Sequence, residues 1–161
     1  MTRSEARRHA FHLIFQIPFA MQTGHSHTEA LAQAKQWYYE SIDSLTDIDG
    51  FSELSRPKGK FDAYITRAIW GVLDKMQDID GVIENFLREW EIERINRVDL
   101  AIMRLAIYEM LRELDVPLGV AANEAVQLAK EYGADESPAF VNGVLGNVAR
   151  EIKEKGREQV G

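Results

Sequence analysis

The sequence predicts an all-α protein, a helical bundle in a single domain, and two patterns carry that prediction. Apolar residues recur at spacings of three and four along nearly the whole chain, which is the period of α-helices that bury one face. Strict alternation with period two is not found, and no hairpin-type Asp-Gly pair joins β-branched runs, since Asp49-Gly50 sits in polar surroundings. A chain of 161 residues suits one domain with its own core.

The first predicted helix covers residues 3–17. Its inward stripe is apolar and consists of Ala6, Ala10, Leu13 and Ile17. Pro18 is expected to end or kink this helix, because proline has no backbone N–H and its ring crowds the preceding turn.

A variable helix-loop region is predicted at about residues 21–60. Thr28 is the expected cap of a short second helix, since its hydroxyl can accept from a first-turn N–H. The apolar side of that helix carries Leu31, Ala34, Tyr38 and Ile42. Residues 44–60 are rich in serine, glycine and proline and predict a long loop.

Three further helices are predicted at residues 61–76, 78–90 and 96–113. The last of these is apolar around most of its circumference, which indicates a position surrounded by other elements. Asn96, with Asp99 three residues on, resembles a helix cap.

The two final helices are predicted at residues 118–132 and from Ser137 onward. Gly133 is the expected left-handed residue that closes the first of them. Ser137 is the expected cap of the second, with Pro138 at its first helical position. The charged tail from Lys153 is expected to fray.

The formal charge of -7 argues against a general nucleic-acid binder, because bulk affinity for nucleic acids comes from cations that neutralise phosphates. The charge is nevertheless uneven. Residues 1–12 have a local excess of positive charge, whereas residues 13–55 are acidic. This pattern favours a focused anion-binding patch on an acidic body.

The sequence contains no cysteine, which excludes disulfides and thiolate metal sites and fits a cytoplasmic location.

The start of the chain faintly resembles a signal peptide, because Arg3, Arg7 and Arg8 precede an apolar run. His12, Gln16 and Pro18 interrupt that run, so we favour an amphipathic helix. No other run is long enough to cross a bilayer, and no membrane partner is expected.

The first helix carries the pattern most typical of a binding site. Cations flank two aromatic rings on a face next to the apolar stripe: Arg3, Arg7, Arg8 and His12 around Phe11 and Phe15. Aromatic rings stack on unpaired bases and guanidinium groups hold phosphates, which is the chemistry of single-stranded RNA recognition. The alternative is that both rings widen the core stripe and the arginines pair with the acidic body.

Other constellations are weaker. His9 with Glu5, or His25 with His27, could suggest a metal, but neither pair has a third ligand at a telling spacing. The carboxylates around Trp90 fit a charged helix end better than an acid/base pair. No Ser-His-Asp order, phosphate-binding loop or dinucleotide glycine pattern is present.

Several blocks of the chain carry spaced motifs. The blocks are Arg3-x-x-x-Arg7-x-x-Ala10-x-x-x-Ile14-Phe15-Gln16, Trp90-x-x-x-Arg94-x-x-x-Val98-Asp99-x-Ala101-Ile102-x-Arg104-Leu105-Ala106-x-Tyr108-Glu109, Val116-Pro117-x-x-Val120-Ala121-x-Asn123-Glu124-Ala125-Val126-x-Leu128-Ala129-Lys130-x-Tyr132-Gly133 and Ser137-x-x-Phe140-Val141-Asn142-Gly143-Val144-Leu145. Together these blocks resemble the NusB family of transcription antitermination factors. The resemblance spans about residues 1–20 and 61–150, and it implies one RNA-binding domain of about seven helices over residues 1–161.

The resemblance also implies a function and partners, and it implies neither catalysis nor a cofactor. Members of this family bind boxA RNA in nascent transcripts together with NusE, a small-subunit ribosomal protein. The pair helps RNA polymerase, within an antitermination complex, to read through terminators in ribosomal RNA operons. A homodimeric protein-interaction module without direct RNA binding is the alternative. An RNA methyltransferase with such a domain at its start is set aside, since this chain has no room for a catalytic domain.

Residue by residue, the resemblance assigns an RNA-binding set and one partner-facing position. The RNA-binding set comprises Arg3, Arg7, Arg8, His12, Phe15, Gln16, Ser137, Phe140 and Asn142. Asp99 matches an acidic position of the helices that face the partner. Phe15 stands where the family usually has tyrosine, so stacking is retained there and the hydroxyl is lost. The start of the final helix is expected to lie beside the first helix.

Overall fold

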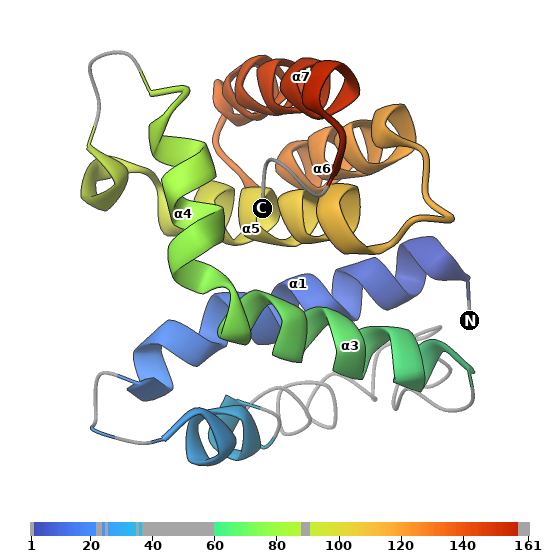
Figure 1. The fold of residues 1–161 in the computed structure, drawn as a ribbon. Helices are drawn as coiled ribbons and strands as arrows, with labels where there is room; N and C mark the ends of the chain where they lie inside the picture. Colours follow the sequence, from blue (N-terminus) through green and yellow to red (C-terminus); the bar gives the residue numbers. More distant parts are fainter. Residues whose placement is uncertain are drawn as a thin grey trace. The chain divides into compact units, whose positions relative to one another are not determined.

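The computed structural model describes residues 2–21, 24, 26–34, 36, 60–87 and 91–157. Within these ranges every regular element is a helix, which confirms the all-α prediction (Figure 1). The chain folds as two compact units, Met1–Trp70 and Gly71–Gly161. Each unit is described by itself below.

The first unit begins with α1, Arg3–Met21. Its predicted inward stripe is buried, since Ala6, Ala10, Leu13 and Ile17 are each at most 1% exposed. Of the two predicted effects of Pro18, ending the helix is wrong, because Pro18 lies inside α1, whereas a kink stays a prediction. A proline removes only one backbone donor, and the helix continues past it to Met21.

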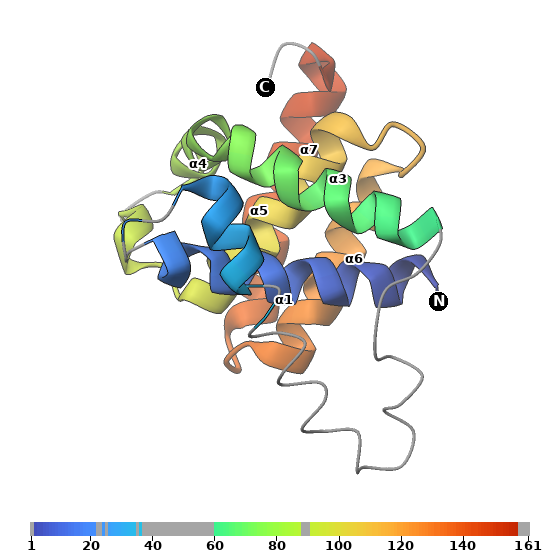
Figure 2. The same cartoon turned by 90° about the horizontal axis from the view of Figure 1, so that it is seen from below.

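A second helical segment, residues 27–34, follows α1 (light blue in Figure 2). Ser26 caps it: the Ser26 hydroxyl accepts from the Glu29 N–H at 3.2 Å and bonds the Glu29 carboxylate at 3.1 Å. This Ser-x-x-Glu arrangement resembles a capping box, so the predicted cap at Thr28 is wrong by two residues. The further apolar positions Tyr38 and Ile42 and residues 44–59 of the predicted loop lie outside the described residues, and Lys60 begins the next helix.

Helix α3, Lys60–Asp74, and helix α4, Met76–Glu84, correspond to the next two predicted helices. Helix α4 ends earlier than predicted, because the chain tightens into turns in which the Phe86 N–H bonds the Ile83 carbonyl at 3.0 Å. A short 3-10 helix, η2, Ile92–Arg94, was not predicted. Trp90 lies outside the described residues.

Three long helices form the body of the second unit: α5, Arg97–Arg112, α6, Leu118–Tyr132, and α7, Ser137–Lys155. They pack side by side, each in contact with the other two (Figure 1). Most side chains of α5 are buried, which confirms the surrounded position that its composition predicts. The Asn96 cap is also confirmed, since its side-chain oxygen accepts from the Val98 N–H at 2.8 Å.

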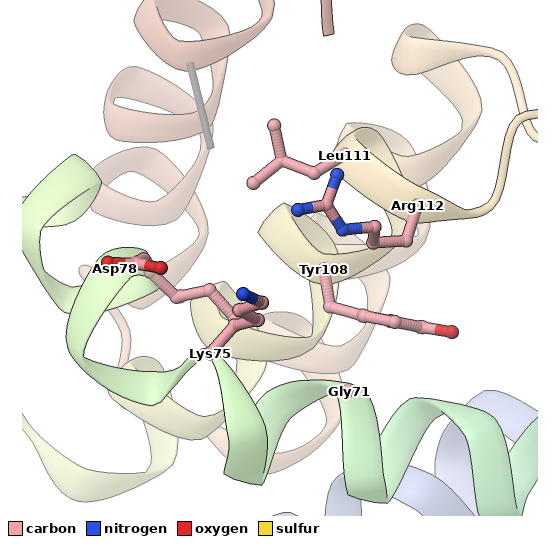
Figure 3. A pocket seen from close by; sticks show the side chains of 7 residues that line it. Gly71, Lys75, Asp78, Tyr108, Leu111 and Arg112 are labelled. Atoms are coloured by element: carbon pink, nitrogen blue, oxygen red, sulfur yellow. The ribbon is translucent and has the colours of Figure 1, made fainter. Parts of the chain in front are cut away.

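Gly71, in the part of α3 that belongs to the second unit, packs directly under the ring of Tyr108 (Figure 3). A Cβ atom at Gly71 would overlap that ring, coming within 2.6 Å of Tyr108 Cδ2. The ring is held from its far end, because the Tyr108 hydroxyl donates to the Glu113 carboxylate at 2.9 Å. Glycine is therefore required at this position for close approach, not for backbone conformation.

The end of α7 is anchored within the same unit. Gly156 has a positive φ of 84°, and it turns the chain out of the helix. The Arg157 guanidinium then donates to the carbonyls of Glu113 and Val116, each at 3.2 Å. The expectation that the tail frays from Lys153 is thus wrong as far as residue 157.

Candidate nucleic-acid interface

Helix α1 starts with a reciprocal cap that the sequence analysis missed. The Thr2 hydroxyl accepts from the Glu5 N–H at 3.1 Å, and the Glu5 carboxylate accepts from the Thr2 N–H at 2.6 Å. That backbone bond, aided by the chain's amino terminus and by Arg8, holds the pKa of Glu5 below its usual value. The Thr-x-x-Glu spacing was the available signal.

The three arginines of α1 differ in their surroundings. The Arg3 guanidinium lies over the Tyr64 ring, with its Cζ atom 4.8 Å from the ring centroid, in a cation–π contact. Arg7 is only 5% exposed, whereas Arg3 and Arg8 are half-buried. Arg8 and Arg3 therefore keep surface that can meet an anion, and Arg7 keeps almost none.

An aromatic ladder runs along α1. The Phe11 and Phe15 ring centroids are 6.3 Å apart, and those of Phe15 and Phe19 are 5.5 Å apart. Phe11 is 1% exposed, so this ring does widen the core, as the alternative interpretation held. Phe15, His12 and Gln16 are half-buried and Phe19 is exposed, so the ladder passes from the core to the surface.

A second group of predicted residues surrounds the start of α7. Phe140 is half-buried and Asn142 is exposed. Phe140 borders an open hollow of about 250 Å³ at the starts of α5 and α7. The hollow is lined by Arg94, Ile95, Asn96, Asp99, Glu136 and Phe140. The sequence analysis missed Arg94, Ile95 and Glu136 as parts of this group, since only tertiary packing brings η2 to α7.

Ser137 does not cap α7 as predicted. It is the first residue of the helix, Glu136 occupies the cap position, and the Ser137 hydroxyl instead accepts from the Ala134 N–H upstream at 2.9 Å. The predicted left-handed Gly133 is also wrong, because its φ and ψ of -91° and -176° are extended. Its lack of a side chain serves close packing, since a Cβ there would lie 2.7 Å from the Ser137 hydroxyl oxygen.

Asp99 lies in the first turn of α5 and is 5% exposed. Burial raises its pKa, a hydrogen bond with Ser137 opposes that rise, and the charge of Glu136 adds to it. The Oδ1 atom of Asp99 is buried and has no hydrogen-bond partner among the described residues. Asp99 is thus a buried carboxylate in the first turn of α5 with one unpartnered oxygen.

The predicted site residues therefore form two groups, one in each compact unit. The α1 group comprises Arg3, Arg7, Arg8, His12, Phe15 and Gln16, and the second group comprises Asp99, Ser137, Phe140 and Asn142. That the two groups lie beside one another stays a prediction.

Other chemistries find little support in the part of the chain that is described. No group of three histidine or acidic side chains is placed to hold a metal ion there, and His25 lies outside it. Glu91 and Glu93 are exposed, and Glu89 is outside the described ranges. None of the described helices is both long enough and apolar enough to cross a membrane.

Comparison with known proteins identifies relatives along nearly the whole chain. A family model described as the NusB family matches residues 4–150. The transcription antitermination protein NusB of Agathobacter rectalis is 39% identical over 149 residues, which cover 92% of this chain and 100% of that protein. That of Acetivibrio thermocellus is 52% identical over 87 residues, which cover 54% of this chain and 60% of that protein. The T. maritima NusB structure matches with a TM-score of 0.73 at 29% identity, covering 94% of this chain and 92% of that one.

Proposed function

Because the chain belongs to the NusB family, we propose that it promotes transcription antitermination by binding boxA RNA in nascent transcripts together with NusE. The family match over residues 4–150 carries this proposal, since it covers most of both compact units and every candidate residue except Arg3. The pair would act within the RNA polymerase antitermination complex and favour read-through of terminators in ribosomal RNA operons. This role needs no catalytic step and no cofactor.

The α1 group would supply the electrostatic part of RNA binding. Arg8 and Arg3 keep exposed surface and suit contacts to phosphates, while the nearly buried Arg7 would act at its one accessible edge. Phe15, half-buried at the middle of the aromatic ladder, suits stacking on an unpaired base. His12 and Gln16 would add hydrogen bonds from the same helix.

The second group would supply another contact to the same RNA strand. Phe140 borders the hollow and suits stacking, and the exposed Asn142 amide suits hydrogen bonds to base edges. Ser137 is 1% exposed, so its part would be structural support for that turn. The start of α5, marked by Asp99, would belong to the surface that faces NusE.

The whole chain would act as one RNA-binding domain over residues 1–161. Its net charge of -7 leaves few cations for phosphates, so affinity without the partner is expected to be low. NusE would extend the RNA-binding surface and raise that affinity.

Filter binding with boxA RNA and a scrambled RNA of the same length tests this proposal. We expect boxA to bind more tightly than the scrambled strand, NusE to increase the affinity, and added salt to reduce it steeply. Equal affinity for both strands with NusE present would refute the proposal. A homodimer that binds NusE but neither RNA would instead support the protein-interaction alternative.

A further inference from the structure

The proposed function leaves the solvent-facing side of α7 unused beyond Asn142. At about 100° per residue, one arc of this helix, called the outer arc here, carries Ala139, Asn142, Gly143, Gly146, Arg150 and Lys153. All of these residues are exposed except Gly146, which is half-buried. No carboxylate falls within the outer arc, although the chain has a net charge of -7. The arc thus passes through one candidate RNA-binding residue and ends at two cations.

Two glycines of the outer arc are not explained by packing within the protein. A Cβ atom at Gly143 or at Gly146 would meet nothing within 4 Å, and neither glycine has a positive φ. Glycine inside a helix is less favourable than alanine, because it loses more conformational freedom on folding. The two glycines therefore leave a strip of helix backbone bare at a cost to the stability of α7.

Arg150 is oriented over this strip by its own helix. Its guanidinium donates to the Asn147 side-chain oxygen at 2.6 Å and to the Gly146 carbonyl at 3.4 Å. These bonds use two of its five N–H donors, and the others have no acceptor in the part of the chain that the structure describes. The guanidinium is therefore held in place and still has donors for a phosphate oxygen.

A second cation joins Arg150 at the end of the outer arc. An open hollow of about 400 Å³, called the α6–α7 hollow here, is lined by Leu118, Gly119, Ala149, Arg150 and Lys153. Lys153 is exposed and has no hydrogen bond or ion pair among the described residues. Of the neighbouring carboxylates, Glu151 bonds Lys155 at 2.9 Å and Glu154 does not line the hollow. The α6–α7 hollow therefore suits an anionic group.

We propose that single-stranded RNA continues beyond the boxA contacts along the outer arc, crosses the backbone at Gly143 and Gly146, and places phosphates on Arg150 and Lys153. This inference rests on the proposed function and extends the RNA path from the start of α7 to its end. Continuity with Asn142 and the positive charge of the arc favour RNA as the occupant. An acidic protein segment fits less well, because the outer arc offers no large apolar side chain as an anchor.

The length of the RNA provides the first test. The helix spans about 16 Å from Asn142 to Lys153, so boxA RNA is extended by about six uridines at its 5′ end or at its 3′ end. With NusE present, we expect one of these two RNAs to bind more tightly than boxA RNA alone. The double variant Arg150→Gln, Lys153→Gln should abolish that gain and leave the affinity for unextended boxA RNA unchanged. It should also lower the salt slope for the extended RNA by about 1.4, two contacts at about 0.7 each.

Lys155→Gln is the matched control for the two cations. It removes the same charge from the same end of α7, but Lys155 is paired with Glu151 and does not line the α6–α7 hollow. This variant should keep the gain from the extension. Equal losses in Lys155→Gln and Arg150→Gln would show that the net charge of the helix end governs binding, and they would overturn the path.

The glycines provide a test in which stability and affinity change in opposite directions. Gly146→Ala should raise the urea midpoint of unfolding, since alanine is the better helix former and its Cβ has free space. The same variant, and more strongly Gly146→Leu, should weaken binding of the extended RNA. Gly81→Ala in α4 is equally unobstructed and should raise the midpoint without changing RNA binding. Wild-type affinity for the extended RNA in a folded Gly146→Leu variant contradicts the path over this glycine.

Other outcomes overturn the inference at the level of the ligand. If neither extension tightens binding, RNA does not continue along α7. If polyglutamate binds the protein in a manner that depends on Arg150 and Lys153, and the extended RNAs gain nothing, the outer arc belongs to an acidic protein partner instead.

An NMR titration with an oligouridylate that lacks boxA separates this inference from the proposed function. The amide signals of Gly143 and Gly146 should shift in the wild-type protein and stay in place in the double variant Arg150→Gln, Lys153→Gln. Unshifted signals in the wild-type protein overturn the inference even if boxA RNA binds. A wild-type protein without preference for boxA RNA would refute the proposed function, and the titration would still decide whether RNA follows α7.

Discussion

The Ser137 hydroxyl accepts from the Ala134 N–H at 2.9 Å, and this bond closes the turn that leads into α7. From the sequence alone, Ser137 before Pro138 looks like a helix cap. In the structure Glu136 occupies the cap position and Ser137 is the first residue of the helix. The serine therefore fixes the turn before α7 and not the first turn of α7 itself.

Asp99→Asn should make stability less dependent on pH. Burial raises the pKa of Asp99, with Glu136 adding to the rise, so the folded state holds this proton more tightly than the unfolded chain. The stability that Asp99 contributes is thus complete below its unfolded pKa of about 3.9 and is lost as pH rises through the folded pKa. Near neutral pH, the free energy of unfolding measured in urea should be higher for Asp99→Asn than for the wild-type protein.

The advantage of Asp99→Asn over the wild-type protein should shrink as the solution is acidified, since protonation then neutralises Asp99 as well. Asp135→Asn, at an exposed position, provides the control and should show no such trend. A stability difference that stays constant across this pH range would contradict the assignment of the cost to the buried charge.

Gly71→Ala should destabilise the fold although alanine is the better helix former. The new methyl group would overlap the Tyr108 ring, which is held in place by its bond to Glu113. Overpacking of this kind costs about 1–3 kcal/mol, which exceeds the gain in helix propensity of about 1 kcal/mol. The free energy of unfolding in urea measures the balance.

Gly81→Ala is the matched control for Gly71→Ala. Gly81 lies within α4, and a Cβ there would meet nothing within 4 Å. This variant should therefore gain about 0.5–1 kcal/mol of stability. Equal effects at both glycines would show that propensity alone governs these positions.

The fold was predictable where one local rule dominates. The bounds of α6 match the prediction, and the composition of α5 predicted its burial. Pro18 does not end α1, because proline removes only one backbone donor and the helix continues to Met21. The left-handed backbone conformation predicted for Gly133 is also wrong. Glycine is required there because a Cβ atom would collide with Ser137.

The candidate site was harder to predict because helical periodicity does not fix how wide the buried arc is. Arg7 follows the buried Ala6 and Phe11 follows the buried Ala10, and both prove to be buried themselves. The hollow could not be predicted at all. It combines Arg94 of η2 with Phe140 of α7, and no sequence period relates residues on separate elements.

Arg157→Ala should lower the free energy of unfolding by about 1 kcal/mol, since it removes two charge-assisted bonds to the carbonyls of Glu113 and Val116. Those carbonyls follow the end of α5 and would have to find water instead. Lys155→Ala is the control, because its exposed pair with Glu151 is screened by water and contributes little to stability. Equal losses would show that Arg157 adds nothing beyond a surface charge.

Arg8→Gln should reduce the salt dependence of RNA binding as well as the affinity. Arg8 is the α1 cation that is half-buried near Glu5, and glutamine keeps much of its packing while removing the charge. Each lost phosphate contact on a single strand lowers the slope of log affinity against log salt by about 0.7. Filter binding of boxA RNA with NusE over a series of salt concentrations measures that slope.

Lys130→Gln removes the same charge from an exposed site in the last turn of α6 and should leave the slope unchanged. Identical slopes for the wild type and both variants would remove Arg8 from the phosphate contacts, because a slope reports the cations that meet phosphate and not the net charge of the protein.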